Sequence, residues 1–171
     1  MQKFDLVVIG AGPSGYAAAM RALDFRKRTL LIERETVGGA GVTNGALSSK
    51  TWWELARETA SFRKNLKRFN IKIPSINYRE IQEEVRRAVK ERRSMLEEHL
   101  LLMQSASGYD GLLTFMKGTA KLINQHEIEI VGDQSRERVW GDYIILATGS
   151  RPRSLPGIVV DEKIGALTML W

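Results

Sequence analysis

The sequence of 171 residues contains no cysteine and only two histidines, His99 and His126. The absence of cysteine excludes disulfides, thiolate metal ligands and thiol nucleophiles from this chain. Two histidines without cysteine partners are too few for a typical zinc site, so we predict no bound metal. No apolar run approaches the roughly 18 residues that a membrane helix needs, and the first residues, MQKFDLVVIG, are expected to enter a strand directly, with no polar cleavage region behind them. We therefore expect a cytoplasmic protein with no membrane contact.

The positive charge of the chain is unevenly distributed. The net charge is +6, and residues 57–93 hold twelve Lys or Arg against five Glu. This basic segment lacks interleaved aromatic residues and any recognisable nucleic-acid-binding motif. We interpret it as a solvated helical face and predict no nucleic-acid partner. With 43% hydrophobic and 27% charged residues, the composition is typical of a soluble globular domain with one core.

Two short apolar runs flank a helical segment near the start of the chain. They are DLVVI at 5–9 and TLLIE at 29–33, and the helical stretch AAAMRAL lies between them at 17–23. Strand, helix and strand in this order predict a βαβ unit over residues 4–35, with two parallel and adjacent strands.

The later segments extend this unit into a larger α/β fold. One helix is predicted to begin after a cap at Ser48 or Ser49, and another near Tyr78 after a cap at Asn77. In chain order we expect a redox-type loop and helices at 36–104, a meander and a final strand at 112–152, and a tail at 153–171. The predicted fold class is a Rossmann-like α/β domain with a parallel sheet, a small antiparallel β meander and a long helical segment.

The pattern G-x-G-x-x-G follows the first predicted strand and opens the helix. Gly10 permits a sharp turn, Gly12 lets the backbone approach a pyrophosphate, and Gly15 allows helix and strand to pack closely. Glu33 ends the second strand, where its carboxylate can accept hydrogen bonds from the ribose hydroxyls of an adenosine. A carboxylate there disfavours a 2′-phosphate, so the predicted ligand is FAD or NAD.

Four segments, taken in this order and spacing, resemble the FAD-binding half of the pyridine nucleotide-disulfide oxidoreductases. These are VVIGAGPSGYAAAMRA at 7–22, LIER at 31–34, GGAGVTNGALSSK at 38–50 and IILATGSRP at 144–152. The family includes dihydrolipoamide dehydrogenase and the soluble pyridine nucleotide transhydrogenase. The resemblance implies a flavoprotein oxidoreductase with FAD as its cofactor.

The resemblance also implies roles for individual residues. Lys50 would be the catalytic residue, because the lysine at this place in relatives lies near the reactive nitrogen of the flavin and stabilises negative charge on the reduced ring. Cofactor-binding roles fall on Gly10, Gly12, Pro13, Ser14, Gly15, Glu33, Arg34, Gly38, Gly39, Thr43, Gly45, Lys50, Gly118, Thr119, Ala120, Ala147, Thr148 and Gly149.

The loop at 38–50 departs from the family pattern at the redox thiols. Family members that reduce a disulfide carry two cysteines, and the matching positions here are Gly41 and Ala46. A flavin can accept hydride without them but cannot pass electrons to a dithiol. The resemblance therefore implies thiol-independent, transhydrogenase-like hydride transfer through FAD in a complete enzyme. Ser48 stands where relatives have proline, so the helix entry near Lys50 is less rigid.

Full members of the family continue past the matched region with a second nucleotide domain for NAD(P)H and a dimerisation domain. We expect residues 1–171 to form a single incomplete FAD/NAD(P)-binding domain, either as a fragment or as a short product that needs the remaining domains or a partner chain. NAD(P)H is expected only for a full-length form, and family members are homodimers. Two alternatives remain: a non-catalytic nucleotide-binding or assembly module, and a domain that binds NAD in place of FAD.

Overall fold

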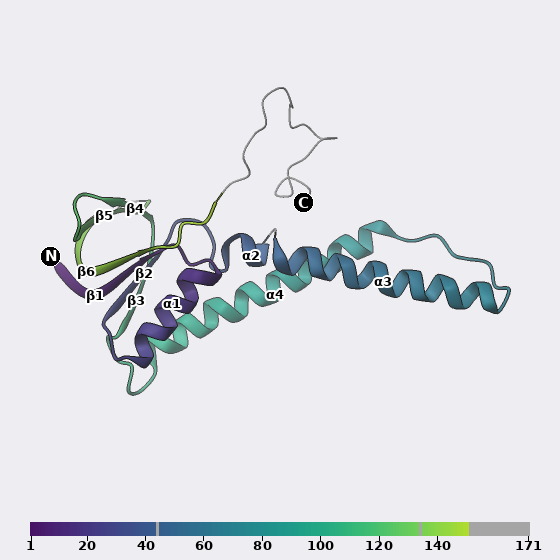
Figure 1. Ribbon diagram of the computed structural model, residues 1–171, viewed down its shortest axis with the longest axis horizontal. Helices are drawn as coiled ribbons and strands as arrows, with labels where there is room; N and C mark the ends of the chain where they lie inside the picture. The colour runs from purple at the N-terminus through teal and green to yellow at the C-terminus, as the bar shows by residue number, and fades with distance from the viewer. Residues whose placement is uncertain (44, 134, 151–171) are drawn as a thin grey trace, which may run out of the picture.

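The computed structural model describes residues 1–43, 45–133 and 135–150 (Figure 1). Its strands form one six-stranded sheet in the order β3-β2-β1-β6-β5-β4. The strands are β1 Gln2–Ile9, β2 Thr29–Glu33, β3 Leu113–Lys117, β4 Thr119–Leu122, β5 Glu127–Val131 and β6 Arg136–Leu146. The helices are α1 Pro13–Asp24, α2 Gly39–Thr43, α3 Ala46–Arg68 and α4 Tyr78–Ser105. This mixed α/β architecture confirms the predicted fold class.

Strand β1 lies between β2 and β6 and is parallel to both. Ile9, the last residue of β1, pairs with Ile32 on one side and Leu146 on the other. The carboxyl ends of three strands therefore meet at one edge of the sheet. In doubly wound sheets, this edge is where ligands bind.

The antiparallel meander is shorter than the sequence predicts. Residues 113–117 form β3, which pairs in parallel with β2 in the main sheet, and the antiparallel pairs are β4 with β5 and β5 with β6. The prediction that the meander begins at residue 112 was therefore wrong. Alternating apolar residues indicate a strand but do not identify its partner; here the Thr29 amide donates to the Leu112 carbonyl at 2.6 Å and starts the parallel pairing.

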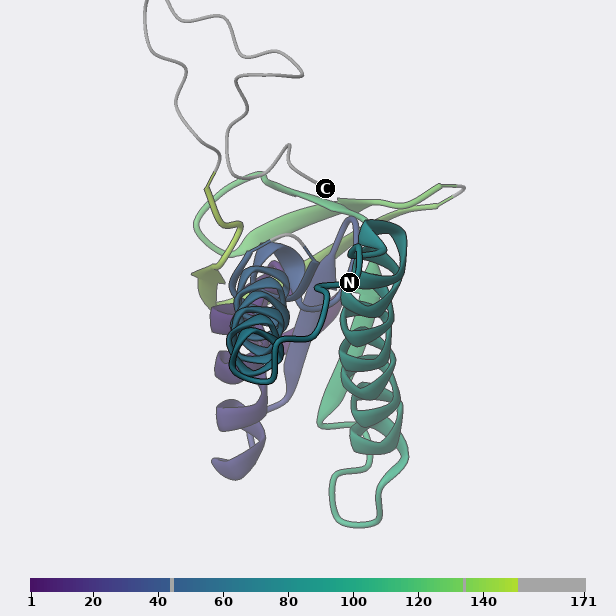
Figure 2. The same cartoon turned by 90° about the vertical axis from the view of Figure 1, so that its right-hand side faces the viewer.

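Both faces of the parallel strands are buried, because successive residues of a strand point to opposite faces. Val8 packs with Leu23 of α1 and Leu100 of α4 on the helical face. Val7 packs with Ile128 of the meander on the other face. Figure 2 shows α1 and α4 on the side of the parallel strands that faces the viewer, with the meander strands above. The sheet thus curls, so that its own meander strands cover the face opposite the helices.

Helices α3 and α4 form a long hairpin that projects away from the sheet (Figure 1). Asn77 precedes α4 as predicted, although its side chain makes no capping hydrogen bond. The prediction of a cap at Ser48 or Ser49 was wrong, since α3 already begins at Ala46 after Gly45. The Ser48 hydroxyl lies inside the helix and donates to the Gly45 carbonyl at 3.2 Å. Within the described ranges, no helix combines the length and the apolar character that a membrane crossing requires.

One polar contact joins α1 to α4 across the helical face. The Tyr16 hydroxyl hydrogen-bonds to Nδ1 of His99. Burial raises the pKa of the Tyr16 phenol, and the Arg92 guanidinium opposes this rise. Tyr16 therefore keeps its proton, and its hydrogen bond to α4, throughout the neutral pH range.

Gly15→Ala should lower the free energy of unfolding by about 3 kcal/mol, the upper range for overpacking. A Cβ at Gly15 would lie 1.9 Å from the Gly10 carbonyl oxygen. In an ordinary helix, glycine to alanine stabilises the protein by about 0.5–1 kcal/mol, so a loss of stability here would be caused by the close packing around Gly15. Urea unfolding compares Gly15→Ala with Gly12→Ala, whose Cβ would meet nothing within 4 Å. Equal stability of both variants would contradict this packing.

Tyr16→Phe should cost about 1 kcal/mol at pH 7, because it removes the hydrogen bond to His99. The ordinary pKa of a tyrosine is 10.0, and that of Tyr16 in the folded chain is higher. As the pH rises past 10.0, the unfolded chain therefore releases the Tyr16 proton while the folded chain retains it, and the native protein should lose stability. The Tyr16→Phe variant has no such proton to release, so the difference in the free energy of unfolding between the two proteins should be smaller at about pH 11 than at pH 7. Urea unfolding at both pH values checks this, with exposed Tyr143→Phe as control.

Candidate nucleotide-binding site

At the start of the turn between β1 and α1 lies a glycine, Gly10, that no other residue replaces without strain. Gly10 has a φ of +103°, and its amide donates to the Ile32 carbonyl at 2.8 Å. A Cβ at Gly10 would lie 2.3 Å from the Ala147 carbonyl oxygen. The Ala147 amide in turn donates to the Ile9 carbonyl at 2.8 Å. The backbone that leaves β6 therefore lies directly against the first turn.

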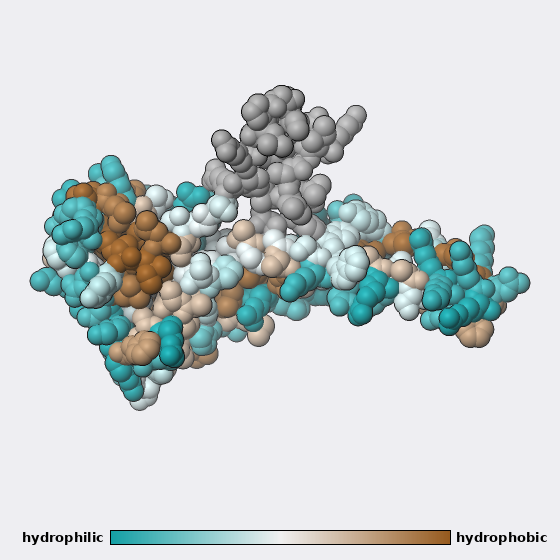
Figure 3. All heavy atoms as spheres, viewed as in Figure 1, coloured by the Kyte–Doolittle hydropathy of each residue, from teal (hydrophilic) through white to brown (hydrophobic). Residues whose placement is uncertain are grey.

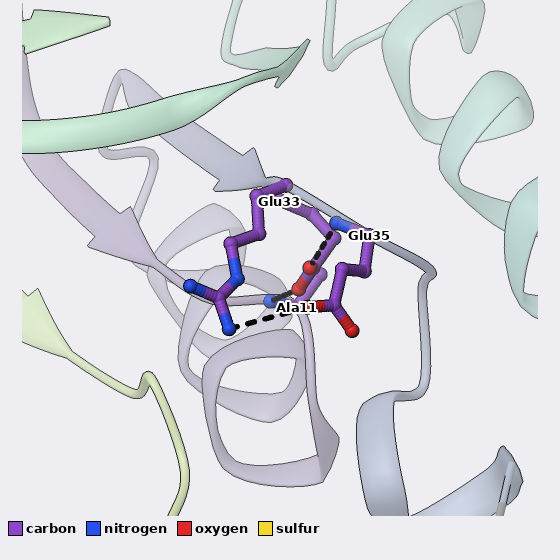
Figure 4. A network of polar contacts seen from close by, with 4 residues as sticks. Ala11, Glu33 and Glu35 are labelled. Atoms are coloured by element: carbon purple, nitrogen blue, oxygen red, sulfur yellow. Dashed lines mark hydrogen bonds and ion pairs between the residues drawn. The ribbon is translucent and has the colours of Figure 1, made fainter. Parts of the chain in front are cut away.

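Glu33 lies at the mouth of this turn (Figure 4). Its Oε2 accepts a hydrogen bond from the Ala11 amide at 2.7 Å, and its Oε1 accepts one from the Glu35 amide at 2.8 Å. The side chain of Arg34 points to Glu35 and forms an exposed ion pair at 3.2 Å. Each carboxylate oxygen has two acceptor positions, so Glu33 can also accept hydrogen bonds from ligand hydroxyls.

Gly12 precedes α1 and faces open space. Its φ is −67°, and a Cβ added there would meet nothing within 4 Å. Pro13 and Ser14 follow in the exposed first turn of α1. The free amides and the positive dipole end at this helix start favour an anionic group. The space beside Gly12 is therefore suited to a phosphate group.

The loop that follows β2 rests on the same turn. The Gly38 amide donates to the Ala11 carbonyl at 2.8 Å, and a Cβ at Gly39 would lie 3.2 Å from the Gly12 Cα. Gly38 and Gly39 have φ values of +92° and +48°. Gly45 is equally confined, since its Cβ would lie 2.4 Å from the Ala40 carbonyl oxygen. The glycines of this loop thus bring its backbone across the first turn.

The remaining predicted residues surround this centre to different degrees. Gly118 lies beside β2, because its amide donates to the Glu33 carbonyl at 2.9 Å, and Thr119 and Ala120 follow it in β4. Thr148 and Gly149 lie exposed just after Ala147. Thr43 and Lys50 are exposed on α2 and α3, and in the described part of the chain no hydrogen bond or ion pair joins them to the first turn.

Two contacts at this site were missed by the sequence reasoning. Ala11 connects three segments, because its amide binds Glu33 and its carbonyl binds Gly38. Only its place between the first two glycines could have indicated this role. The second contact joins α2 to α1: a Cβ at Gly41 would lie 2.5 Å from Cγ of Pro13. No local sequence pattern signals that approach, because the two residues come from different elements.

Comparison with known proteins identifies the family of this chain. The sequence pattern of the pyridine nucleotide-disulphide oxidoreductase family matches residues 4–168. The chain belongs to this family. It is 36% identical over 165 residues to a dihydrolipoyl dehydrogenase of Chlamydia pneumoniae, covering 95% of this chain and 34% of that protein. It is 32% identical over 166 residues to a leghemoglobin reductase of Glycine max, covering 93% and 30%.

The fold has a counterpart among solved structures. The HOCl-induced flavoprotein disulfide reductase RclA of Escherichia coli superposes with a TM-score of 0.69 at 19% identity, covering 89% of this chain and 29% of that one. At this identity the likeness concerns the fold, which is that of the FAD-binding Rossmann-like domain. The chain spans about a third of the length of the relatives it matches.

Gly41→Cys should lower the free energy of unfolding by about 2 kcal/mol, because its Cβ must displace either Pro13 or α2. Ala46→Cys should change the stability by less than about 0.5 kcal/mol, since Ala46 is exposed and already carries a Cβ. Urea unfolding under reducing conditions measures both. A Gly41→Cys variant as stable as Ala46→Cys would show that the Pro13 contact does not constrain α2.

Proposed function

We propose that this chain is the FAD-binding portion of a flavin-dependent pyridine nucleotide oxidoreductase that works without a redox dithiol. The observation that carries the proposal is the meeting of Glu33 and Gly12 at the carboxyl ends of β1 and β2. A carboxylate for the ribose and an open glycine for the pyrophosphate lie on either side of Ala11.

The geometry of the described residues fits a dinucleotide. A side chain at Gly12 would occupy space that no protein atom fills within 4 Å, while at Gly10 and Gly15 side chains would collide with backbone. The turn is thus closed toward the sheet and open toward a ligand. Glu33 is already held by two amides, so its carboxylate is oriented before any ligand binds. Both features support nucleotide binding over a purely structural turn.

The proposal assigns each predicted residue a contact by its place around this centre. Pro13, Ser14 and the α1 amides would hold phosphate groups, and Arg34 would lie near the adenosine side of Glu33. Gly38, Gly39, Thr43 and Gly45 would hold the backbone of the loop along the cofactor. Gly118, Thr119 and Ala120 would contact the adenine, and Ala147, Thr148 and Gly149 would border the pyrophosphate.

When bound, FAD supplies a two-electron acceptor, and this chain contributes its binding and its electrostatic surroundings. We propose that Lys50 stabilises negative charge near the flavin, since it lies one turn inside α3 after the glycine loop. The chain has no cysteine, so its own residues offer no thiol relay. This composition favours a transhydrogenase-like reaction between NADPH and NAD in a full-length form.

The absence of thiols also supports a second candidate, a non-catalytic nucleotide-binding or assembly module. The two candidates differ in nicotinamide turnover. Transfer of hydride from NADPH to an NAD analogue by the FAD-loaded full-length gene product would support the enzyme. Tight FAD binding with no nicotinamide oxidation would support the module.

Gly12→Val should weaken FAD binding by about 100-fold or more without unfolding the chain, because its side chain fills the open space beside α1. Glu33→Gln should weaken FAD binding by about 10- to 100-fold, because it removes hydrogen bonds to a charged acceptor. Quenching of flavin fluorescence measures both affinities, and circular dichroism checks the fold.

Glu137→Gln on exposed β6 is the matched control and should leave FAD affinity unchanged. If Gly12→Val binds FAD as tightly as the native chain, the assignment of this turn to the pyrophosphate is wrong. Competition with NAD tests the other dinucleotide. Displacement of FAD by an equal concentration of NAD would identify an NAD domain.

A further inference from the structure

The edge of the sheet at β3 carries a polar contact that the nucleotide site does not use. Strand β3 ends the sheet, because β2 is its sole strand neighbour in the described part of the chain. Helix α4 lies beside it (Figure 2). The Phe115 amide of β3 donates to Oε1 of Gln104, in the last turn of α4, at 3.1 Å. This side chain therefore satisfies a backbone donor that an end strand otherwise leaves free.

The Phe115 amide points away from β2, because successive residues of a strand present their backbone groups to opposite sides. The Thr29 amide donates to the Leu112 carbonyl, and the Gly118 amide donates to the Glu33 carbonyl. The positions on both sides of β3 that bond to β2 are even-numbered, so the even-numbered residues of β3 face β2. Phe115 is odd-numbered and therefore faces the edge, where another chain can add a strand.

Gln104 lies on the apolar face of α4. Leu96, Leu100 and Met103 pack on this face against the sheet, and Gln104 follows Leu100 by four residues, which places it on the same side of the helix. A polar side chain in such a place is costly unless it makes a hydrogen bond. Gln104 and Phe115 are both half-buried, so their hydrogen bond is partly shielded from water. The Gln104 side chain is therefore directed toward the sheet.

The loop between α4 and β3 holds these two elements together. The Arg26 guanidinium donates to the Gly108 carbonyl and lies over the Tyr109 ring, with 5.4 Å between its Cζ and the ring centroid. Within the loop, the Tyr109 amide donates to the Ala106 carbonyl and the Leu112 amide donates to the Tyr109 carbonyl, both at 2.9 Å. The end of α4 is thereby fixed at the edge of β3. In the space-filling view, hydrophilic side chains lie below the apolar patch of the sheet (Figure 3).

We propose that the Gln104 side chain guards the edge of β3, so that another copy of this chain cannot add a strand there. The sequence of β3 is LTFMK, which contains no proline and a single charge, at exposed Lys117. A strand edge of this kind is a template for pairing with a second strand. The Gln104 oxygen occupies the place that a carbonyl of the added strand would take at the Phe115 amide. The proposal does not depend on FAD binding.

Two variants of similar size separate the hydrogen bond from the packing. Gln104→Met removes the acceptor oxygen, whereas Gln104→Glu keeps one in the same place. Hydrogen exchange followed by NMR should show the Phe115 amide exchanging at least about 10-fold faster in Gln104→Met than in the native chain, and within about 3-fold of the native rate in Gln104→Glu. Gln125→Met, in the exposed turn before β5, is the matched control and should leave this rate unchanged.

A fluorescent peptide with the sequence of residues 111–119, GLLTFMKGT, tests strand addition directly. In fluorescence anisotropy it should bind Gln104→Met at least about 10-fold more tightly than it binds the native chain or Gln104→Glu, because main-chain hydrogen bonds supply the affinity. A control peptide with Phe115→Pro lacks the amide and should not bind. Sedimentation velocity should show a larger, concentration-dependent species for Gln104→Met than for the native chain, and circular dichroism checks that the variant is folded.

Three outcomes would overturn the proposal. If Gln104→Met sediments and binds the peptide as the native chain does, the edge of β3 is closed by something other than Gln104. If Gln104→Glu associates as strongly as Gln104→Met, the hydrogen bond is not the guard. Equal binding of the peptide with Phe115→Pro would show apolar attraction in place of strand pairing. Should Gln104→Met fail to fold, Gln104→Ala, which keeps a good helix former without the amide, repeats all three measurements.

Discussion

The whole nucleotide site depends on the close backbone approach of three strand ends around Gly10 and Ala11. Gly10 lies so near the Ala147 carbonyl that a single Cβ would collide with it at 2.3 Å. Ala11, without a large side chain, binds Glu33 through its amide and the loop through its carbonyl. Apart from the Glu33 carboxylate, backbone groups make these contacts, so their positions depend mainly on the sheet register. The site is therefore as rigid as the strands that form it.

The second layer of constraint is the loop that crosses the first turn. Gly38 and Gly39 adopt left-handed conformations, which let the loop fold back over the start of α1. Gly41 brings α2 against Pro13, since a Cβ at this position would lie 2.5 Å from Cγ of the proline. Loop and turn thus pack as one unit, in a chain that contains no thiol.

The hairpin of α3 and α4 has a different character from the sheet. Near the sheet, α4 contributes buried Leu100 to the core, and its His99 contacts Tyr16 of α1. At the far end the helices have few partners, and apolar and cationic side chains both face solvent.

The sequence by itself determined the βαβ unit, the glycine turn and the acid at the end of β2, because these features depend on local spacing between neighbours in the chain. Only the tertiary structure decided that residues 113–117 pair with β2, since alternation marks a strand without identifying its partner. The same holds for the start of α3 at Ala46 and for the Pro13–Gly41 contact. The β2–β3 pairing and the Pro13–Gly41 contact arise between segments distant in sequence, where packing, and no local pattern, selects the arrangement.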